Sequence, residues 1–290
     1  MRGLLFVLYA HVVGSAVVRW LPRRVWYALA DLLLPLVLLG WPGQVRRASV
    51  NMRRILGPGA SDRDVTRRTA IAFKNYARYT IDLLWLSRST REEREAVCDV
   101  EGWEQVPAAI ERGRGLVIVT GHFGNWDLPA AILAGRGFPV NTIVETLEPP
   151  AWNARVQAIR ERIGIHAIPM ETGARQLYEA LKRNETVAIV FDRPLASGGV
   201  PVTYFGAETR LPEGVARLAL RTGATVVGAV GLRRGDRVIA KVSPPFEIER
   251  TGDRDRDAQL LTQQMVSWLE GLVRQHPGQW FMFRDFWPKS

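Results

Sequence analysis

A histidine and an aspartate lie five positions apart in GLVIVTGHFGNWDLPAAILAG, residues 115–135, where a short apolar run ends. A histidine with a carboxylate on one ring nitrogen works as a general base, because the carboxylate fixes the tautomer and stabilises the imidazolium that forms. No serine or cysteine is adjacent to His122, so a hydroxyl of the substrate is the natural nucleophile. His122 and Asp127 could also be a structural pair at a helix start, because this spacing often arises by chance.

The spacing of the two residues constrains the elements that carry them. On one regular helix, residues five apart point about 140° away from each other and cannot meet. They can meet if His122 lies in the turn after a strand and Asp127 in the first turn of the next helix. Gly121 and Gly124 give this turn backbone freedom. Asn125 is a good N-cap, and Pro129 is tolerated in a first helical turn. The positive end of the helix dipole would then stabilise the Asp127 carboxylate.

The rest of the chain alternates between β-branched runs and helical-looking segments. A long helix is predicted over 62–86 and an amphipathic one over 257–275. This alternation predicts an α/β fold with a central, mostly parallel sheet flanked by helices. The predicted strands lie at 115–120, 140–144, 186–191, 224–230 and 237–242.

The amino terminus has the pattern of a membrane-associating leader. Residues 3–18 and 25–41 are largely apolar, but a full span needs roughly 20 consecutive apolar residues, and Asp31 and Pro35 interrupt the second run. Arginine and aromatic flanks favour a helical anchor in the membrane interface. We expect a leader over 1–45 and an α/β domain over 46–290. A true span, a cleaved signal peptide and two buried helices remain alternatives. The flanking residues are Arg2, Arg19, Arg23, Arg24, Arg46, Arg47, Arg53, Arg54, Tyr9, Trp20, Trp26 and Tyr27.

Composition limits the classes of partner and metal site that the chain is expected to have. The net charge of +10 favours acidic partners such as nucleic acid, an anionic bilayer or an acidic carrier protein. Nucleic acid is disfavoured because the amino-terminal charge flanks apolar runs instead of a groove-reading motif. Cys98 is the single cysteine, which excludes an intrachain disulfide and a thiolate metal cluster, and the spacing of the four histidines argues against zinc.

Six segments resemble one family in the same order along the chain. GHFGNWD resembles the His-x4-Asp/Glu signature of bacterial membrane glycolipid acyltransferases, which include the lipid A late acyltransferases and the phosphatidylinositol mannoside acyltransferases. The ending HPGQWFMF is closer to the phosphatidylinositol mannoside type, which argues against a lipid A acceptor. The other matching segments are RRASVNMRRILG, FKNYARYTIDLLWL, RVQAIRERIGIHAIP and the block that begins VAIVFDRPLASGG.

The resemblance implies transfer of a fatty acyl chain from a thioester, on acyl carrier protein or coenzyme A, to a hydroxyl of a membrane glycolipid or phospholipid. It implies a site at the cytoplasmic face of the inner membrane, with the protein peripheral or monotopic. The family needs no metal and no bound redox cofactor.

Matching positions assign roles to individual residues. His122 would deprotonate the acceptor hydroxyl and Asp127 would orient His122. Arg160, and Arg162 second to it, would bind the acceptor phosphate or the oxyanion. Asp192 would position the acceptor or serve the structure. The substrate-binding candidates are therefore Arg160, Arg162, Asp192 and Arg193.

Other readings of these residues stay open. The arginines of 151–163 could form a solvated helix face, and Asp192 with Arg193 a surface ion pair. Glu213 is expected near a helix start instead of in the site. A scaffolding protein that has lost chemistry, or a lipid hydrolase using water, are the alternative functions. The usual serine hydrolase is disfavoured because the chain has no Gly-x-Ser-x-Gly elbow.

Overall fold

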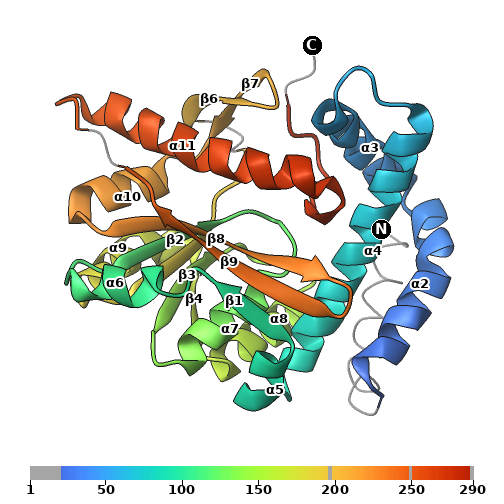
Figure 1. The fold of residues 1–290 in the computed structure, drawn as a ribbon, viewed down its shortest axis with the longest axis horizontal. Helices are drawn as coiled ribbons and strands as arrows, with labels where there is room; N and C mark the ends of the chain where they lie inside the picture. Colours follow the sequence, from blue (N-terminus) through green and yellow to red (C-terminus); the bar gives the residue numbers. More distant parts are fainter. Residues whose placement is uncertain (1–20, 195–197, 248–249, 288–290) are drawn as a thin grey trace.

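The computed structural model describes residues 21–194, 198–247 and 250–287 (Figure 1). The first apolar run, residues 3–18, lies outside the described residues. The predicted leader is therefore seen only from residue 21 onward.

A seven-stranded sheet forms the centre of the molecule, in the order β1-β9-β8-β2-β5-β3-β4. Neighbouring strands are parallel except β8 and β9. This architecture confirms the predicted α/β fold with a mostly parallel sheet. The strands are β1 (Cys98–Glu101), β2 (Leu116–Thr120), β3 (Val140–Val144), β4 (Ile165–Pro169), β5 (Thr186–Val190), β8 (Thr225–Arg234) and β9 (Arg237–Pro245), with a separate hairpin of β6 (Val200–Tyr204) and β7 (Ala207–Leu211).

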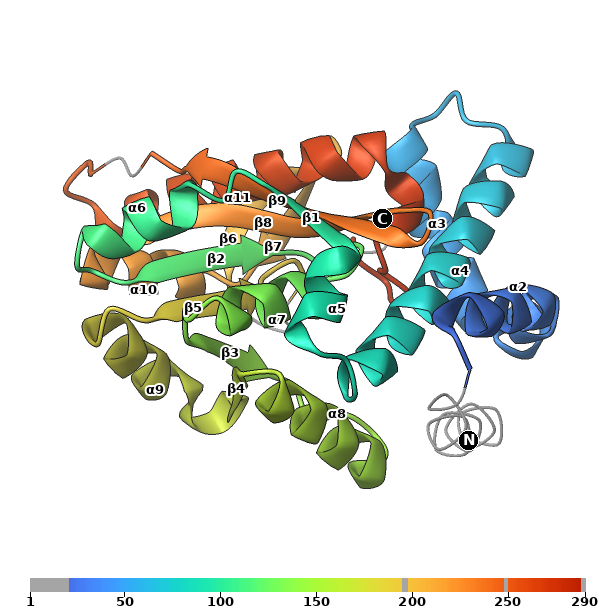
Figure 2. The ribbon, with the colours of Figure 1, turned by 60° about the horizontal axis from the view of Figure 1, so that its bottom comes forward.

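Helices cover both faces of the sheet. In Figures 1 and 2, α11 lies on one side of the strands and α7 on the other. The central strand β2 is buried along its whole length, so it reads as a continuous apolar run. Its side chains alternate between two cores: Val117 and Val119 pack with α9, α10 and α11, while Leu116 and Ile118 pack with α6, α7 and α8. The helices are α2 (Arg23–Gly40), α3 (Pro42–Leu56), α4 (Asp62–Leu86), α5 (Arg91–Ala96), α6 (Gln105–Glu111), α7 (Asp127–Gly135), α8 (Pro150–Arg162), α9 (Met170–Lys182), α10 (Gly214–Thr222) and α11 (Arg254–Gln275).

The sheet is split near the carboxyl ends of β3 and β5. These strands pair only through Val140 with Thr186 and Asn141 with Val187. Beyond those pairs β5 continues along β2, and β3 continues along β4. Residues 142–144 and 188–190 are therefore half-buried, unlike the closely paired first residues of both strands. This separation leaves room for a cavity within the sheet.

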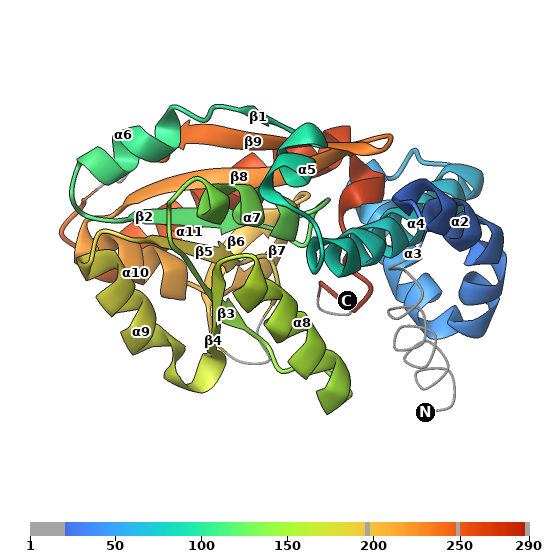
Figure 3. The same ribbon diagram turned by 90° about the horizontal axis from the view of Figure 1, so that it is seen from below.

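The three amino-terminal helices gather at one end of the sheet, as Figure 3 shows. No single helix among the described residues is long and apolar enough to cross a membrane, but α2 and α3 pass that test together, with a bend of 97° between them. Several leucines of α2 face outward, with exposed fractions of 73% for Leu32, 65% for Leu36 and 77% for Leu39. α2 therefore presents an apolar surface that the described residues do not cover.

A buried aspartate of α4 connects α2 to the loop that holds His122. Asp82 is fully buried and accepts hydrogen bonds from Tyr27 and Arg23 of α2 and from Arg233 of β8. Its Oδ2 atom also accepts a hydrogen bond of 3.0 Å from Asn125. Four elements distant in the sequence thus share one carboxylate.

Candidate active site

His122 lies in the turn after β2 and is held there by a carboxylate that follows β5, the neighbouring strand in the sheet. Its Nδ1 atom is 2.6 Å from Oδ1 of Asp192, and its backbone N–H donates to Oδ2 of the same residue at 2.9 Å. Because β2 and β5 are parallel neighbours, their carboxyl ends meet at the same edge of the sheet. Asp192, two residues beyond β5, is thereby brought to His122.

The Asp192 carboxylate is fully buried but stays ionised. Burial alone would raise its pKa, but the charge of His122 and hydrogen bonds from His122 and from the Trp280 indole, at 2.7 Å, hold the pKa of Asp192 below its ordinary value. An ionised carboxylate only accepts hydrogen bonds, so Nδ1 of His122 carries a proton, and in the neutral imidazole the free lone pair is then on Nε2. His122 is thus arranged as a base at Nε2.

The prediction that Asp127 orients His122 is corrected by the structure. Asp127 begins α7, as expected, but its carboxylate points toward α4 and α8. It accepts a hydrogen bond of 2.7 Å from the Tyr79 hydroxyl and two from Arg160, at 2.9 and 3.3 Å. The Trp126 ring lies between the two centres, 5.6 Å from His122 and 4.1 Å from Tyr79 by ring centroids. Asp127 is therefore separated from His122 by the side chains of Trp126 and Tyr79.

Arg160 is bound to Asp127 instead of standing free for a substrate anion. Burial would lower the pKa of Arg160, but the charge of Asp127 and its hydrogen bonds with Arg160 raise it above its ordinary value. Its side chain is 13% exposed and lines the same cavity as His122. The neutralised pair is better suited to donating hydrogen bonds to a polar headgroup than to attracting a phosphate.

The remaining predicted residues divide between the cavity and the surface. Arg193 lines the cavity. Arg162 is exposed at the end of α8 and does not line it. Glu213 directly precedes α10, as expected, and its carboxylate is paired with Arg217. The N-cap of α7 is Trp126, one residue after the predicted Asn125, but the Asn125 side chain accepts a hydrogen bond from the backbone N–H of Leu128 in the first turn.

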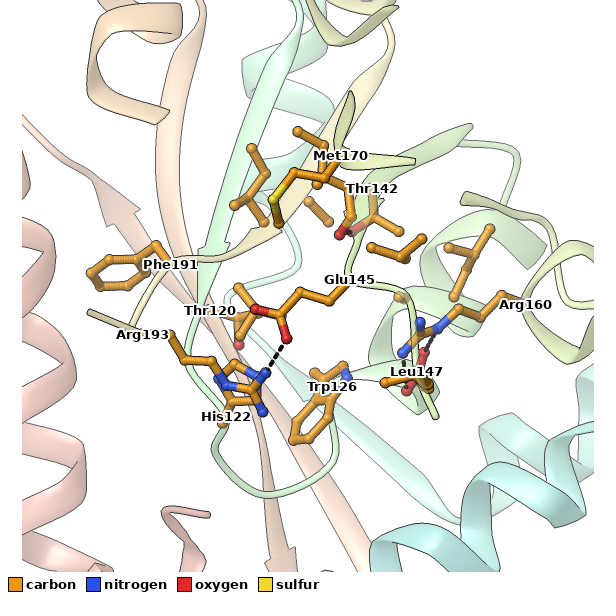
Figure 4. Close-up of a pocket in the computed structure, with 18 of the residues that line it drawn as sticks. Thr120, His122, Trp126, Thr142, Glu145, Leu147, Arg160, Met170, Phe191 and Arg193 are labelled. Carbon is orange, nitrogen blue, oxygen red and sulfur yellow. Dashed lines mark hydrogen bonds and ion pairs between the residues drawn. The ribbon is translucent and has the colours of Figure 1, made fainter. Parts of the chain in front are cut away.

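A cavity of about 620 Å³ extends from His122 into the split between β3 and β5. This size is ordinary for a small-molecule site. Polar residues gather near His122, whereas the deeper walls are apolar (Figure 4). The apolar walls come from both sides of the sheet and are formed by Ile143, Val144, Trp152, Val156, Met170, Ala174, Leu177, Ala188, Ile189, Val215 and Leu218. The arrangement can place a long apolar chain beside a general base.

Sequence reasoning missed several residues that complete the site. Trp280 holds Asp192, and Phe281 donates its backbone N–H to the His122 carbonyl at 2.8 Å. Both lie in the carboxy-terminal tail, whose resemblance to the family was the one available signal. Glu145 and Tyr79 carried no local pattern that separates them from other loop or helix residues.

The lowered pKa of Asp192 leads us to predict how the free energy of unfolding depends on pH. A carboxylate with a depressed folded-state pKa contributes stability that is present above the unfolded pKa and is lost as the pH falls through the folded pKa. Between about pH 5 and about pH 2 we expect the wild type to lose more unfolding free energy than Asp192→Asn, because the amide does not titrate. Urea unfolding curves at each pH measure this, and parallel losses in both proteins would contradict it.

Comparison with known proteins gives consistent matches. The model of the bacterial lipid A biosynthesis acyltransferases matches residues 4–289. The chain is 29% identical to the phosphatidylinositol mannoside acyltransferase of Mycolicibacterium smegmatis, covering 86% of this chain and 80% of that one. It is also 29% identical to the protein of that name from Mycobacterium tuberculosis, over 86% of this chain and 78% of the relative. The crystal structure of a 1-acyl-sn-glycerophosphate acyltransferase from Thermotoga maritima covers 86% of this chain and 98% of its own, at 18% identity and a TM-score of 0.34.

Proposed function

We propose that this chain, which belongs to the bacterial lipid A biosynthesis acyltransferase family, transfers a fatty acyl chain from a thioester, on acyl carrier protein or coenzyme A, to a hydroxyl of a membrane glycolipid or phospholipid. The observation that carries the proposal is the pair of His122 with buried Asp192 at the entrance of an apolar cavity. The base would face the reacting hydroxyl, and the cavity would receive the acyl chain.

The reaction follows from the geometry of the base. Nε2 of His122 takes the proton of the acceptor hydroxyl while the hydroxyl oxygen attacks the thioester carbonyl carbon. The resulting tetrahedral intermediate collapses as the carbon–sulfur bond breaks, and the imidazolium returns its proton to the departing thiolate. Asp192 stabilises the imidazolium during this step because its charge is buried beside Nδ1. No covalent acyl-enzyme is needed.

The acyl chain would lie in the split of the sheet. The walls formed by the carboxyl halves of β3 and β5 and by α9 and α10 are apolar, and burying methylene groups there is favourable by about 0.8 kcal/mol each. The Asp127–Arg160 pair and Tyr79 border the cavity beside His122, where they would contact the polar headgroup of the acceptor.

The tail and the relatives favour one acceptor type over another. The two mycobacterial relatives carry the name phosphatidylinositol mannoside acyltransferase. We therefore favour a glycosylated phospholipid of that type over lipid A.

The amino-terminal helices would place the enzyme on the cytoplasmic face of the inner membrane. The exposed leucines of α2 suit the acyl boundary of a bilayer, and basic residues of α3, including Arg46 and Arg53, suit its anionic headgroups. The net charge of +10 favours the same surface and an acidic acyl carrier protein.

The proposal is tested by mass spectrometry of membrane lipids from cells with and without the gene. We expect a lipid class that lacks one acyl chain in the deletion strain and that wild type restores but His122→Ala does not. An unchanged lipid profile with expressed, membrane-bound protein would favour a scaffolding role instead. Release of free fatty acid from a thioester without acylation of a lipid would indicate a hydrolase.

A further inference from the structure

Two oppositely charged side chains meet across the cavity entrance. Glu145 directly follows β3, and Arg193 follows β5 by three residues, so they extend from the two strands that separate. Their Oε2 and Nη1 atoms are 2.6 Å apart, and Figure 4 shows the pair beside His122. The ion pair therefore spans the opening through which a substrate would reach the base.

A second guanidinium lines the same cavity. Arg284 belongs to the carboxy-terminal tail, and within residues 21–194, 198–247 and 250–287 its side chain is paired with no carboxylate. Arg193 and Arg284 line the same cavity, and partial burial and the positive charge of Arg193 lower the pKa of Arg284, while the carboxylate of Glu145 acts in the opposite direction. The Nε atom of Arg193 is buried and has no hydrogen-bond partner among the described residues. The cavity wall thus carries the guanidiniums of Arg193 and Arg284, and among the described residues only that of Arg193 is paired with Glu145.

We propose that Arg193 and Arg284 form a binding site for a phosphate group of a substrate, and that Glu145 occupies Arg193 until the phosphate replaces it. Guanidinium groups bind phosphate through paired, charge-assisted hydrogen bonds, which Arg284 and, once Glu145 is displaced, Arg193 would supply from the cavity wall. The site is distinct from Arg160, whose guanidinium is already committed to Asp127. The proposal rests on the proposed acyl transfer, because the phosphate belongs either to the thioester donor or to the phospholipid acceptor.

Because Glu145 and Arg193 are paired, the proposal predicts changes in KM of opposite direction when one or the other is replaced. Arg284→Gln and Arg193→Gln are each expected to raise the KM of the phosphate-bearing substrate by about tenfold or more, the size of a lost charged hydrogen bond. Glu145→Gln is expected to lower that KM, because it removes the internal competitor for Arg193. If the pair served only to hold the loops together, removing either partner would act in the same direction. Arg234→Gln, which changes an exposed arginine at the end of β8, controls for the loss of one positive charge.

Paired substrates identify the source of the phosphate. Palmitoyl-coenzyme A is compared with S-palmitoyl-N-acetylcysteamine, a thioester without phosphate, and a phosphatidylinositol-based acceptor is compared with a neutral alkyl mannoside. A change in KM confined to the coenzyme A donor assigns the site to the donor. A change confined to the phospholipid assigns it to the acceptor. Equal effects on substrates with and without phosphate would overturn the proposal.

A binding measurement separates this proposal from the proposed acyl transfer. Calorimetry on full-length His122→Ala, with and without Arg284→Gln, gives the affinities for coenzyme A and for glycerophosphoinositol without turnover. Weaker binding of either ligand to the double variant supports the phosphate site even if the wild type transfers no acyl chain. Unchanged affinity for both ligands would overturn the site even if acyl transfer is established.

Discussion

Replacing Asp192 with asparagine is expected to lower kcat on the order of 10⁴-fold, the loss seen when the aspartate of a Ser-His-Asp triad becomes an amide. Asparagine can donate a hydrogen bond to Nδ1, which would move the proton of His122 to Nε2 and leave no lone pair toward the acceptor. The amide also lacks the charge that stabilises the imidazolium. Steady-state kinetics on protein of unchanged circular dichroism and membrane binding measures this effect.

Asp127→Asn is the matched control for that substitution, because the sequence predicts Asp127, and the structure indicates Asp192, as the residue that orients His122. Asp127 bonds to Tyr79 and Arg160, so its amide variant should keep the His122 tautomer and lose far less in kcat. Its expected effect is on acceptor KM and on stability, since Arg160 is left buried without its counter-charge. A larger loss of kcat in Asp127→Asn than in Asp192→Asn would restore the original assignment from sequence.

Asp82→Ala is expected to lower the free energy of unfolding by about 3–5 kcal/mol, the range for removing one partner of a buried ion pair. Its carboxylate is fully buried, and the substitution leaves Arg233 with no counter-charge and Asn125 without an acceptor. Urea unfolding of the detergent-solubilised protein, followed by tryptophan fluorescence, measures the change.

Asp31→Ala provides the comparison, because Asp31 also joins α2 to α4. It is paired with Lys74 and Arg78, but its side chain is 31% exposed. A pair open to solvent contributes only about 0–1 kcal/mol, so this variant should unfold close to the wild type. Similar losses in the two variants would show that burial of Asp82 does not determine its contribution.

The central strands and the turn at His122 could be predicted from local patterns. The runs at β2, β3, β5, β8 and β9 are rich in β-branched and apolar residues, because most of their side chains are buried or half-buried on the two faces of the sheet. The edge strands β1 and β4 were missed for the opposite reason. Their sequences, CDVE and IHAIP, place exposed residues among buried ones and carry little apolar signal. The β6–β7 hairpin was also missed.

The partner of His122 could not be read from the sequence because strand order is not local. Asp192 is separated from His122 by 70 residues, and only the adjacency of β2 and β5 brings them together. Asp127 was favoured because it is near in sequence and suits a helix start. The direction of its side chain depends on Tyr79 and Arg160, which come from helices that pack only in the folded chain.

The shared carboxylate of Asp82 bears on how this protein can be shortened. A chain cut at residue 45 to improve solubility would lose Tyr27 and Arg23, two of the donors that Asp82 satisfies. The carboxylate would keep Arg233 and Asn125, and water would reach a position beside the loop that holds the proposed catalytic base, His122. The α2 helix therefore supports the loop of the proposed catalytic site from inside the protein, in addition to its proposed contact with lipid. A truncated enzyme without α2 is expected to misreport the catalytic rate of the whole chain.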